Sequence, residues 1–256
     1  MNLIKKVFTT GALVASSLIG LVGTGCSPSV KSVRPVVSAG LNASRPIHSV
    51  KKIPKYMRDV PIHKDDSGVP GAIKDGANVY PLFDIALKPG ARIETDVVSL
   101  DILGNFSLPL SRNLNRRNYT NHVGTEKRGE GAALTYYDVG YGPLVIPGVE
   151  VNACFPIKDT DFGVILGSSY REYKLNLQNG WDRYDKLEKR KDYTLGTIKE
   201  TGLYTGVRFF PNRKKKGFFL ELTGGVNLID FESEKAIEVK YDDVTWRMGL
   251  FAGFKF

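Results

Sequence analysis

Apolar and polar residues alternate strictly along the last segment of the chain, Val244–Phe256. Every second position is apolar: Val244, Trp246, Met248, Leu250, Ala252, Phe254 and Phe256. The positions between them include Arg247 and Lys255. Because successive side chains of a β-strand point to opposite faces, this two-residue period predicts a strand with one apolar and one polar face.

The same period recurs along the second half of the chain, and helical spacing of apolar residues is nearly absent. It predicts strands over Ser99–Leu110, Leu134–Phe155, Phe162–Asn176, Tyr193–Phe210 and Gly217–Phe231. Val79–Leu87 can supply a seventh strand. An eighth must come from the segment before it, or from a break of Leu134–Phe155 near Pro143 and Pro147, since proline disrupts a central strand.

The connections between the predicted strands alternate between short and long. Pro156–Asp161 and Pro211–Gly217 are short turns, whereas Ser111–Gly131, Gln178–Asp192 and Glu232–Asp243 are long and highly charged. Such asymmetry is typical of transmembrane β-barrels, which have short periplasmic turns and longer external loops. The predicted fold class is therefore all-β, an antiparallel up-and-down transmembrane β-barrel.

The N-terminal segment 1–25 has the layout of a secretory signal peptide. Lys5 and Lys6 precede an apolar stretch, Val7–Val22, and small residues follow it. The alternative is a transmembrane anchor, but the stretch is short for about 20 apolar residues and contains Thr, Ser and Gly. We expect an exported protein.

Residues 26–78 differ in composition from the rest. They are rich in Pro, Ser and basic residues, and no acidic residue precedes Asp59. We expect an extended basic tether before a barrel domain at 79–256. The alternative is a basic arm that docks on an anionic surface through Lys31, Arg34, Arg45, Lys51, Lys52, Lys55 and Arg58.

Charge and cysteine content narrow the chemistry. The chain has 256 residues and a formal net charge of +9, which favours an anionic partner. Its only cysteines are Cys26 and Cys154, without the C-x-x-C spacing of a zinc site. We expect no metal and no cofactor, and we expect no nucleic-acid partner because an exported protein is in the wrong compartment.

Two motifs resemble those of bacterial envelope proteins. "VGTGC" resembles a lipobox, with matches at Thr24, Gly25 and Cys26, although Gly23 replaces the usual Leu. This resemblance implies lipidation of Cys26, which would leave Cys154 without a disulfide partner.

The second motif lies at the C-terminus. "GLFAGFKF" resembles the assembly signal of outer-membrane β-barrels, and over Arg92–Phe256 the chain is similar to small barrels of the OmpA/OmpX type. This resemblance implies eight strands, a location in the bacterial outer membrane, and contacts with outer-membrane lipid or lipopolysaccharide and with the barrel assembly machinery.

A small barrel has a filled interior rather than an open channel. With apolar side chains outward, the polar positions face this interior, and buried charges there should pair. The expected interior network is Asp101, Asp138, Glu150, Glu221, Arg247 and Lys255, with Asn152 beside it and Glu221–Lys255 as one pair. The expected aromatic girdle at the membrane interfaces is Trp246, Phe254, Phe256, Phe209, Phe210 and Phe218.

Evidence for catalysis is weak. His122 lies in the first long loop, but no barrel strand offers a histidine and no serine has a recognisable nucleophile spacing, so we expect that the protein is not an enzyme. Trp181 and Tyr184 lie among charges in the second long loop, a composition that can mark recognition of a surface ligand.

Three functions remain open. The first is an integral outer-membrane barrel with a structural, adhesive or ligand-binding role. The second is a lipid-modifying barrel enzyme that uses His122, and the third is a lipoprotein whose soluble barrel binds an apolar ligand.

Overall fold

The chain forms a closed antiparallel β-barrel. The computed structural model describes residues 29–51, 76–79, 81–110, 123–124, 133–183, 186–211, 217–234 and 237–256. The eight barrel strands are β1 (Ser32–Ser44), β4 (Leu82–Glu94), β5 (Ser99–Pro109), β8 (Ile146–Pro156), β9 (Phe162–Arg183), β10 (Lys186–Phe209), β11 (Gly217–Ser233) and β13 (Val244–Lys255).

These strands follow one another around the barrel in chain order. Each pairs antiparallel with the next, and β13 pairs with β1 to close the ring. The predicted all-β, eight-stranded, up-and-down architecture is confirmed. Among the described residues, no helix is long and apolar enough to span a membrane.

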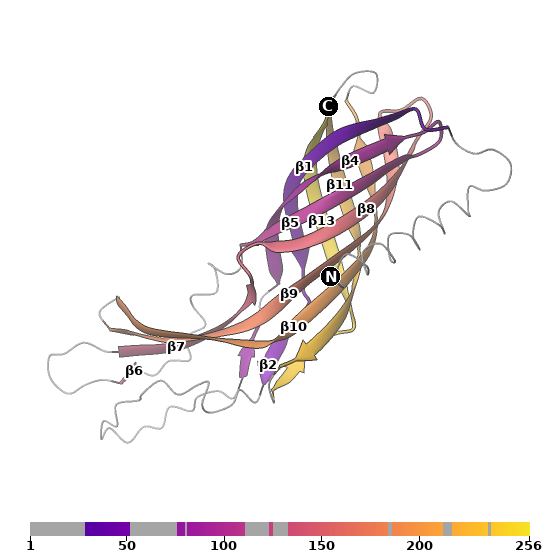
Figure 1. Ribbon diagram of the computed structural model, residues 1–256. Helices are drawn as coiled ribbons and strands as arrows, with labels where there is room; N and C mark the ends of the chain where they lie inside the picture. Colours follow the sequence, from indigo (N-terminus) through magenta and orange to yellow (C-terminus); the bar gives the residue numbers. More distant parts are fainter. Residues whose placement is uncertain are drawn as a thin grey trace.

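The other five strands lie at one end of the barrel. β2 (Ser49–Lys51), β3 (Gly76–Asn78) and β12 (Glu238–Lys240) form a separate three-stranded sheet. β7 (Ala133–Gly142) pairs with the far half of β9, and β6 (Val123–Gly124) pairs with β7. Figure 1 shows β7 and the ends of β9 and β10 projecting past the barrel, with β2 nearby.

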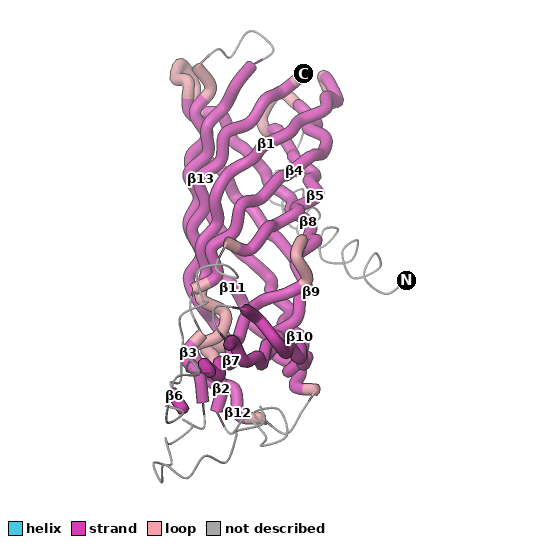
Figure 2. The backbone as a smooth tube through the Cα atoms, turned by 90° about the vertical axis from the view of Figure 1, so that its left-hand side faces the viewer, coloured by secondary structure: helices cyan, strands magenta, loops and turns pink. Residues whose placement is uncertain are grey.

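The two ends of the barrel differ as the loop lengths predict. The turn end carries residues 95–98, 157–161 and 210–211 and the C-terminus, whereas the longer connections join strands at the loop end. In Figure 2 the C-terminus lies at the top and β2, β3 and β12 lie at the bottom, at the loop end. One predicted loop differs, because Gln178–Asp192 largely continues β9 and β10 as a paired hairpin.

The N-terminal boundary also needs correction. The segment 26–78, expected to be a tether, contains β1, which is the eighth barrel strand. Its alternation was obscured because its outward positions include Pro35, Ala39 and Ala43, which carry a weak hydrophobic signal. The prolines do break Leu134–Phe155 into β7 and β8, with residues 143–145 between them, but β7 pairs only outside the ring.

Side-chain burial shows which face of each strand looks outward. On β13, Trp246, Met248 and Leu250 are 44%, 57% and 55% exposed, whereas Thr245 and Arg247 are buried. The other exposed large apolar side chains of the barrel strands are Val33, Leu41, Phe83, Ile85, Leu87, Ile102, Phe106, Leu108, Phe162, Val164, Leu166, Leu203, Val207, Phe218, Leu220, Leu222, Val226, Leu228, Val244 and Phe254. The barrel is therefore apolar outside and polar inside.

A second region, the cap, lies at the loop end and has the opposite polarity. Its core gathers buried side chains from the three-stranded sheet and the residues flanking it, from β7, from the first residues of β4 and β8, and from the far parts of β9, β10 and β11. These are Ile47, Val50, Val79, Leu82, Val139, Tyr141, Ile146, Tyr173, Leu175, Leu177, Leu195, Ile198 and Ile229. The cap therefore has an apolar core, which lies next to the loop end of the polar barrel interior.

Candidate functional site

The barrel interior is filled by ionised side chains of balanced charge. Among the described residues, five cations and five anions are buried there. The cations are Lys88, Arg92, Arg171, Arg208 and Arg247, and the anions are Asp84, Asp101, Glu150, Glu200 and Glu221. Because a buried charge is costly unless it is paired and hydrogen-bonded, this balance is what allows so many charges to be buried together.

The layer nearest the turn end centres on two arginines. Arg92 donates from Nε and Nη2 to both carboxylate oxygens of Asp101, at 2.6 and 2.8 Å. Arg208 contacts Asp101 and also Glu221, its neighbour in register on β11. The ring centroid of Phe219 lies 4.8 Å from the guanidinium carbon of Arg92 and 5.1 Å from that of Arg208. The layer joins four strands.

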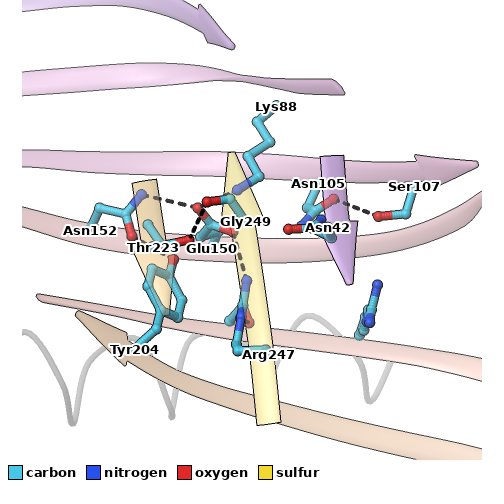
Figure 3. A network of polar contacts seen from close by, with 12 residues as sticks. Asn42, Lys88, Asn105, Ser107, Glu150, Asn152, Tyr204, Thr223, Arg247 and Gly249 are labelled. Atoms are coloured by element: carbon cyan, nitrogen blue, oxygen red, sulfur yellow. Dashed lines mark hydrogen bonds and ion pairs between the residues drawn. The ribbon is translucent and has the colours of Figure 1, made fainter. Parts of the chain in front are cut away.

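The middle layer crosses the barrel and is shown in Figure 3. Lys88 on β4 donates to Glu150 on β8 at 2.9 Å, and Asn152 donates to the same carboxylate oxygen at 3.0 Å. Arg247 lies 3.9 Å from the other oxygen of Glu150 and stacks over the ring of Tyr204. These contacts link strands that are not neighbours in the wall.

The layer nearest the loop end centres on Arg171. Its guanidinium contacts Asp84 at 2.7 Å, Glu200 at 2.7 Å and the hydroxyl oxygen of Ser44 at 3.1 Å. Tyr173 donates its hydroxyl to Glu200 at 2.6 Å. Tyr173 also belongs to the cap core, so this layer joins the polar interior to the cap.

Glycines make room for the large interior rings. A Cβ on Gly253 would lie 2.2 Å from the ring of Phe219, and a Cβ on Gly167 would lie 2.3 Å from the ring of Tyr204. Both rings stack on interior guanidinium groups. The glycines on the polar face therefore permit the cation–aromatic layers.

Little free space remains between the middle and loop-end layers. A cavity beside Asn42, Asn227 and Arg247 measures about 10 Å³, which is the size of one water molecule. With three layers of ion pairs and such a small cavity, the barrel interior is plugged and is not an open channel. Among the described residues, no group of three or more His, Cys, Asp or Glu side chains could hold a metal ion.

The residues expected inside the barrel have several locations. Asp101, Glu150, Glu221, Arg247 and Asn152 lie in the turn-end and middle layers. Lys255 lies at the turn-end rim and donates to Glu94 at 2.8 Å. The expected Glu221–Lys255 pair does not form, because the register places Lys255 beside Gly217 and Glu221 beside Phe251.

The remaining predicted residues cannot be placed in this network. Asp138 lies on β7, outside the ring of eight strands, and Trp181 lies on the far part of β9; their side chains fall outside the described part. Cys26, His122 and Tyr184 lie outside the described residues. Lipidation, catalysis and loop recognition at these positions therefore stay predictions.

Six interior residues escaped the sequence analysis. Each occupies an inward position of its strand. They are Asp84, Lys88, Arg92, Arg171, Glu200 and Arg208. Asp84, Lys88, Arg92 and Arg208 lie between apolar neighbours, which is a recognisable signal, whereas Arg171 lies beside Glu172 and Glu200 lies between Lys199 and Thr201. Phe210, expected in the outer girdle, instead packs inside near the arginines of the turn-end layer.

The turn-end rim carries exposed ion pairs. Lys31 contacts Asp96 in the turn between β4 and β5, and Ser29 donates to the same side chain. The hydrogen bond from Lys31 holds the pKa of Asp96 below its usual value. The pair joins the start of β1 to the neighbouring turn.

Comparisons with known proteins find structural similarity alone. No family model matches the chain. No curated protein matches it either.

Three solved structures show its range of similarity. Neisserial surface protein A is 9% identical, with 88% of this chain and 100% of that one covered and a TM-score of 0.39. The N-terminal β-barrel domain of Pseudomonas aeruginosa OprF is 8% identical, with 87% and 98% covered and a TM-score of 0.34. The outer membrane protease OmpT from Escherichia coli is 9% identical, with 91% and 98% covered and a TM-score of 0.34. At this similarity they assign neither a family nor an activity to the chain.

Proposed function

We propose that the protein is an integral barrel of the bacterial outer membrane, with a structural or adhesive role that its loop end performs at the cell surface. The observation that carries this proposal is the polarity of the barrel wall. A water-soluble protein rarely exposes a continuous apolar surface of this extent, and a bilayer is the solvent that matches it.

Strand lengths agree with a membrane span. β1 and β4 have 13 residues each, β5 and β8 have 11 each, and β13 has 12. A tilted transmembrane strand needs about 9–11 residues. β9 and β10 have 22 and 24 residues, and their excess length forms part of the cap.

Aromatic side chains gather near the turn end, as in an interfacial girdle. Phe162 and Phe209 are paired in register, with ring centroids 5.0 Å apart, and Phe254 and Phe256 are also 5.0 Å apart. In outer-membrane barrels such girdles flank the apolar band, and the short turns face the periplasm. This orientation puts the cap outside the cell.

The plugged interior favours a role other than transport. Three layers of ion pairs cross the barrel, so solute passage would require breaking buried pairs. The cap, with its own core and projecting hairpin, is the part available to a surface ligand. The soluble ligand-binding barrel does not fit, because it needs an apolar cavity inside and a polar surface outside.

Membrane insertion is testable with the whole mature chain. Protein refolded in detergent should migrate differently on SDS gels before and after boiling. It should also insert into phospholipid vesicles, and its turn end should then be protected from protease that is added to one side of the vesicle membrane. A chain that stays soluble without detergent and shows no heat-dependent migration would contradict the proposal.

A further inference from the structure

A hollow of about 440 Å³ opens at the loop end, where the chain passes from β7 to β8. One side is lined by Pro143 and Pro147, and the other by Tyr193, Thr194 and Thr197 of β10. Its volume lies within the range of small-molecule sites, about 300–1,000 Å³.

The hollow exists because the barrel wall is interrupted here. β9 pairs with β8 as far as Arg171, opposite Gly148, and pairs with β7 only from Lys174, opposite Gly142. Residues 172 and 173 therefore have no ladder partner on this side. Proline has no backbone N–H, so Pro143 and Pro147 cannot donate a hydrogen bond to the free edge of β9.

The hollow lies just beyond the level at which outward side chains change from apolar to polar. On β9 the outward positions change from Leu166 through Tyr170 to Glu172, and on β10 they change from Leu203 to Lys199. Thr201 of β10 lies opposite Tyr170 of β9, so the change occurs at the same level on the two strands. The proposed membrane surface therefore lies beside the hollow.

The depth of the hollow sets the size of a membrane-anchored occupant. From Tyr170 to Asn176, at about 3.3 Å per residue and a tilt of about 40°, the hollow extends roughly 5–15 Å beyond the apolar belt. The polar region of a phospholipid leaflet is only about 5–8 Å deep. An occupant anchored in the bilayer that fills the hollow needs a longer head group.

The lining chemistry suits hydroxyl groups. Lys174 is half exposed, and its nearest described acidic partner, Glu234, is 3.7 Å away. Glu172 accepts a hydrogen bond from Tyr170 at 3.0 Å through one oxygen. With the amide of Asn176 and the hydroxyl of Thr197, the lining offers donors and acceptors and one charge of each sign. An uncharged group that both donates and accepts matches this set.

We propose that this hollow binds the saccharide head group of a glycolipid in the outer leaflet. Sugar hydroxyls would bond to Lys174, Asn176 and Thr197, and the acyl chains would lie against the apolar belt below. This inference rests on the proposed membrane location and adds a specific lipid class to it.

The test uses the folded full chain in detergent, titrated with a lipopolysaccharide that carries core sugars but no O-antigen. Phosphatidylglycerol serves as the anionic lipid without a saccharide. Thr197→Trp fills the hollow and Asn176→Ala removes one hydrogen-bonding group. Leu203→Trp, on the outward face of the same strand within the belt, is the matched control.

We expect Thr197→Trp to weaken lipopolysaccharide binding by about tenfold or more, Asn176→Ala to weaken it several-fold, and Leu203→Trp to change it less than about twofold. Unchanged binding in both hollow variants, no binding at all, or equal binding of phosphatidylglycerol with the same dependence on the variants would overturn the inference. Vesicle insertion of the same samples separates the two proposals. A chain that inserts without preferring the saccharide lipid contradicts this site alone, and a chain that does not insert contradicts both.

Discussion

The barrel and the cap use the same strands with opposite polarity. On β9, Val164 and Leu166 point outward in the barrel while Arg171 points inward, but further along Lys174 points outward and Leu175 inward. On β11 the outward positions change from the apolar Leu228 to the charged Asp230, and the inward residue between them is the apolar Ile229. The inversion occurs at one level, because Glu200 of β10 pairs with Arg171 on one side and Ile229 on the other.

The difference shows that the surroundings decide which face is apolar. In both regions the strand period is two and the sheet is continuous. In the proposed location hydrocarbon surrounds the barrel, so its polar groups must find their partners inside the ring. Water surrounds the cap, so apolar side chains form its core. The level of inversion therefore marks the expected membrane surface more sharply than any loop does.

The largest expected effect is on the interior charge balance. Arg208→Met leaves Glu221 buried without its cation, and we expect it to lower the free energy of unfolding by about 3–5 kcal/mol. Urea titration of the vesicle-inserted protein, followed by tryptophan fluorescence, measures this. Arg34→Met, which removes a partly exposed 3.9 Å pair at the rim, should change the free energy of unfolding little. Equal effects of the two variants would mean that the layer is not dry.

The second largest effect is expected from a charged substitution on the apolar outer face of the barrel. Leu250→Arg, near the middle of β13, should destabilise the inserted barrel by about 2–4 kcal/mol, whereas Val244→Arg at the loop-end edge should cost about 0–1 kcal/mol. The same unfolding titration in vesicles measures both. If both substitutions proved neutral, the outer face would be in contact with water and not with lipid.

A third substitution acts on the cap alone. Leu175 is fully buried in the cap core, and Leu175→Ala should cost about 2–3 kcal/mol of local stability. Hydrogen exchange should accelerate in β2, β3 and β12 and stay slow in β1 and β13, because the cap can open without the ring. Equal acceleration in β13 would show that cap and barrel unfold as one unit.

The smallest expected effect is the pH dependence of the turn-end rim. The pKa of Asp96 is lowered on folding, so its contribution to stability is present above the unfolded pKa, about 3.9, and is lost as pH falls through the lower folded value. Asp96→Asn should therefore remove the contribution of this carboxylate to the difference in stability between neutral and strongly acidic pH. Proton-linked stability measured at low and high salt tests it, since salt screens an exposed pair. An identical pH profile in the variant would exclude the contribution.

Particular segments show why some elements were predictable and others were not. Val244–Phe256 alternates with large apolar residues, so the pattern predicts its strand and places its arginine on the face opposite to these residues. Ser32–Ser44 has Pro and Ala at outward positions, and because these small residues carry little hydrophobic signal, its sequence predicts part of a tether and not a strand. The charged segment Gln178–Asp192 lacks an apolar face, so its sequence predicts a loop, although its described residues pair as a hairpin.

The sequence by itself determined the local features: the two-residue period, the alternation of short and long connections, and which residues share a face. These depend on neighbours in the chain. Ring closure, the identity of the eighth strand and the partners of each buried charge were decided only by the tertiary structure. Lys88 meets Glu150 across 62 positions, and Arg171 meets Asp84 across 87. Such pairs follow from the stagger of a closed ring, because one shift in register exchanges every partner without changing the local pattern.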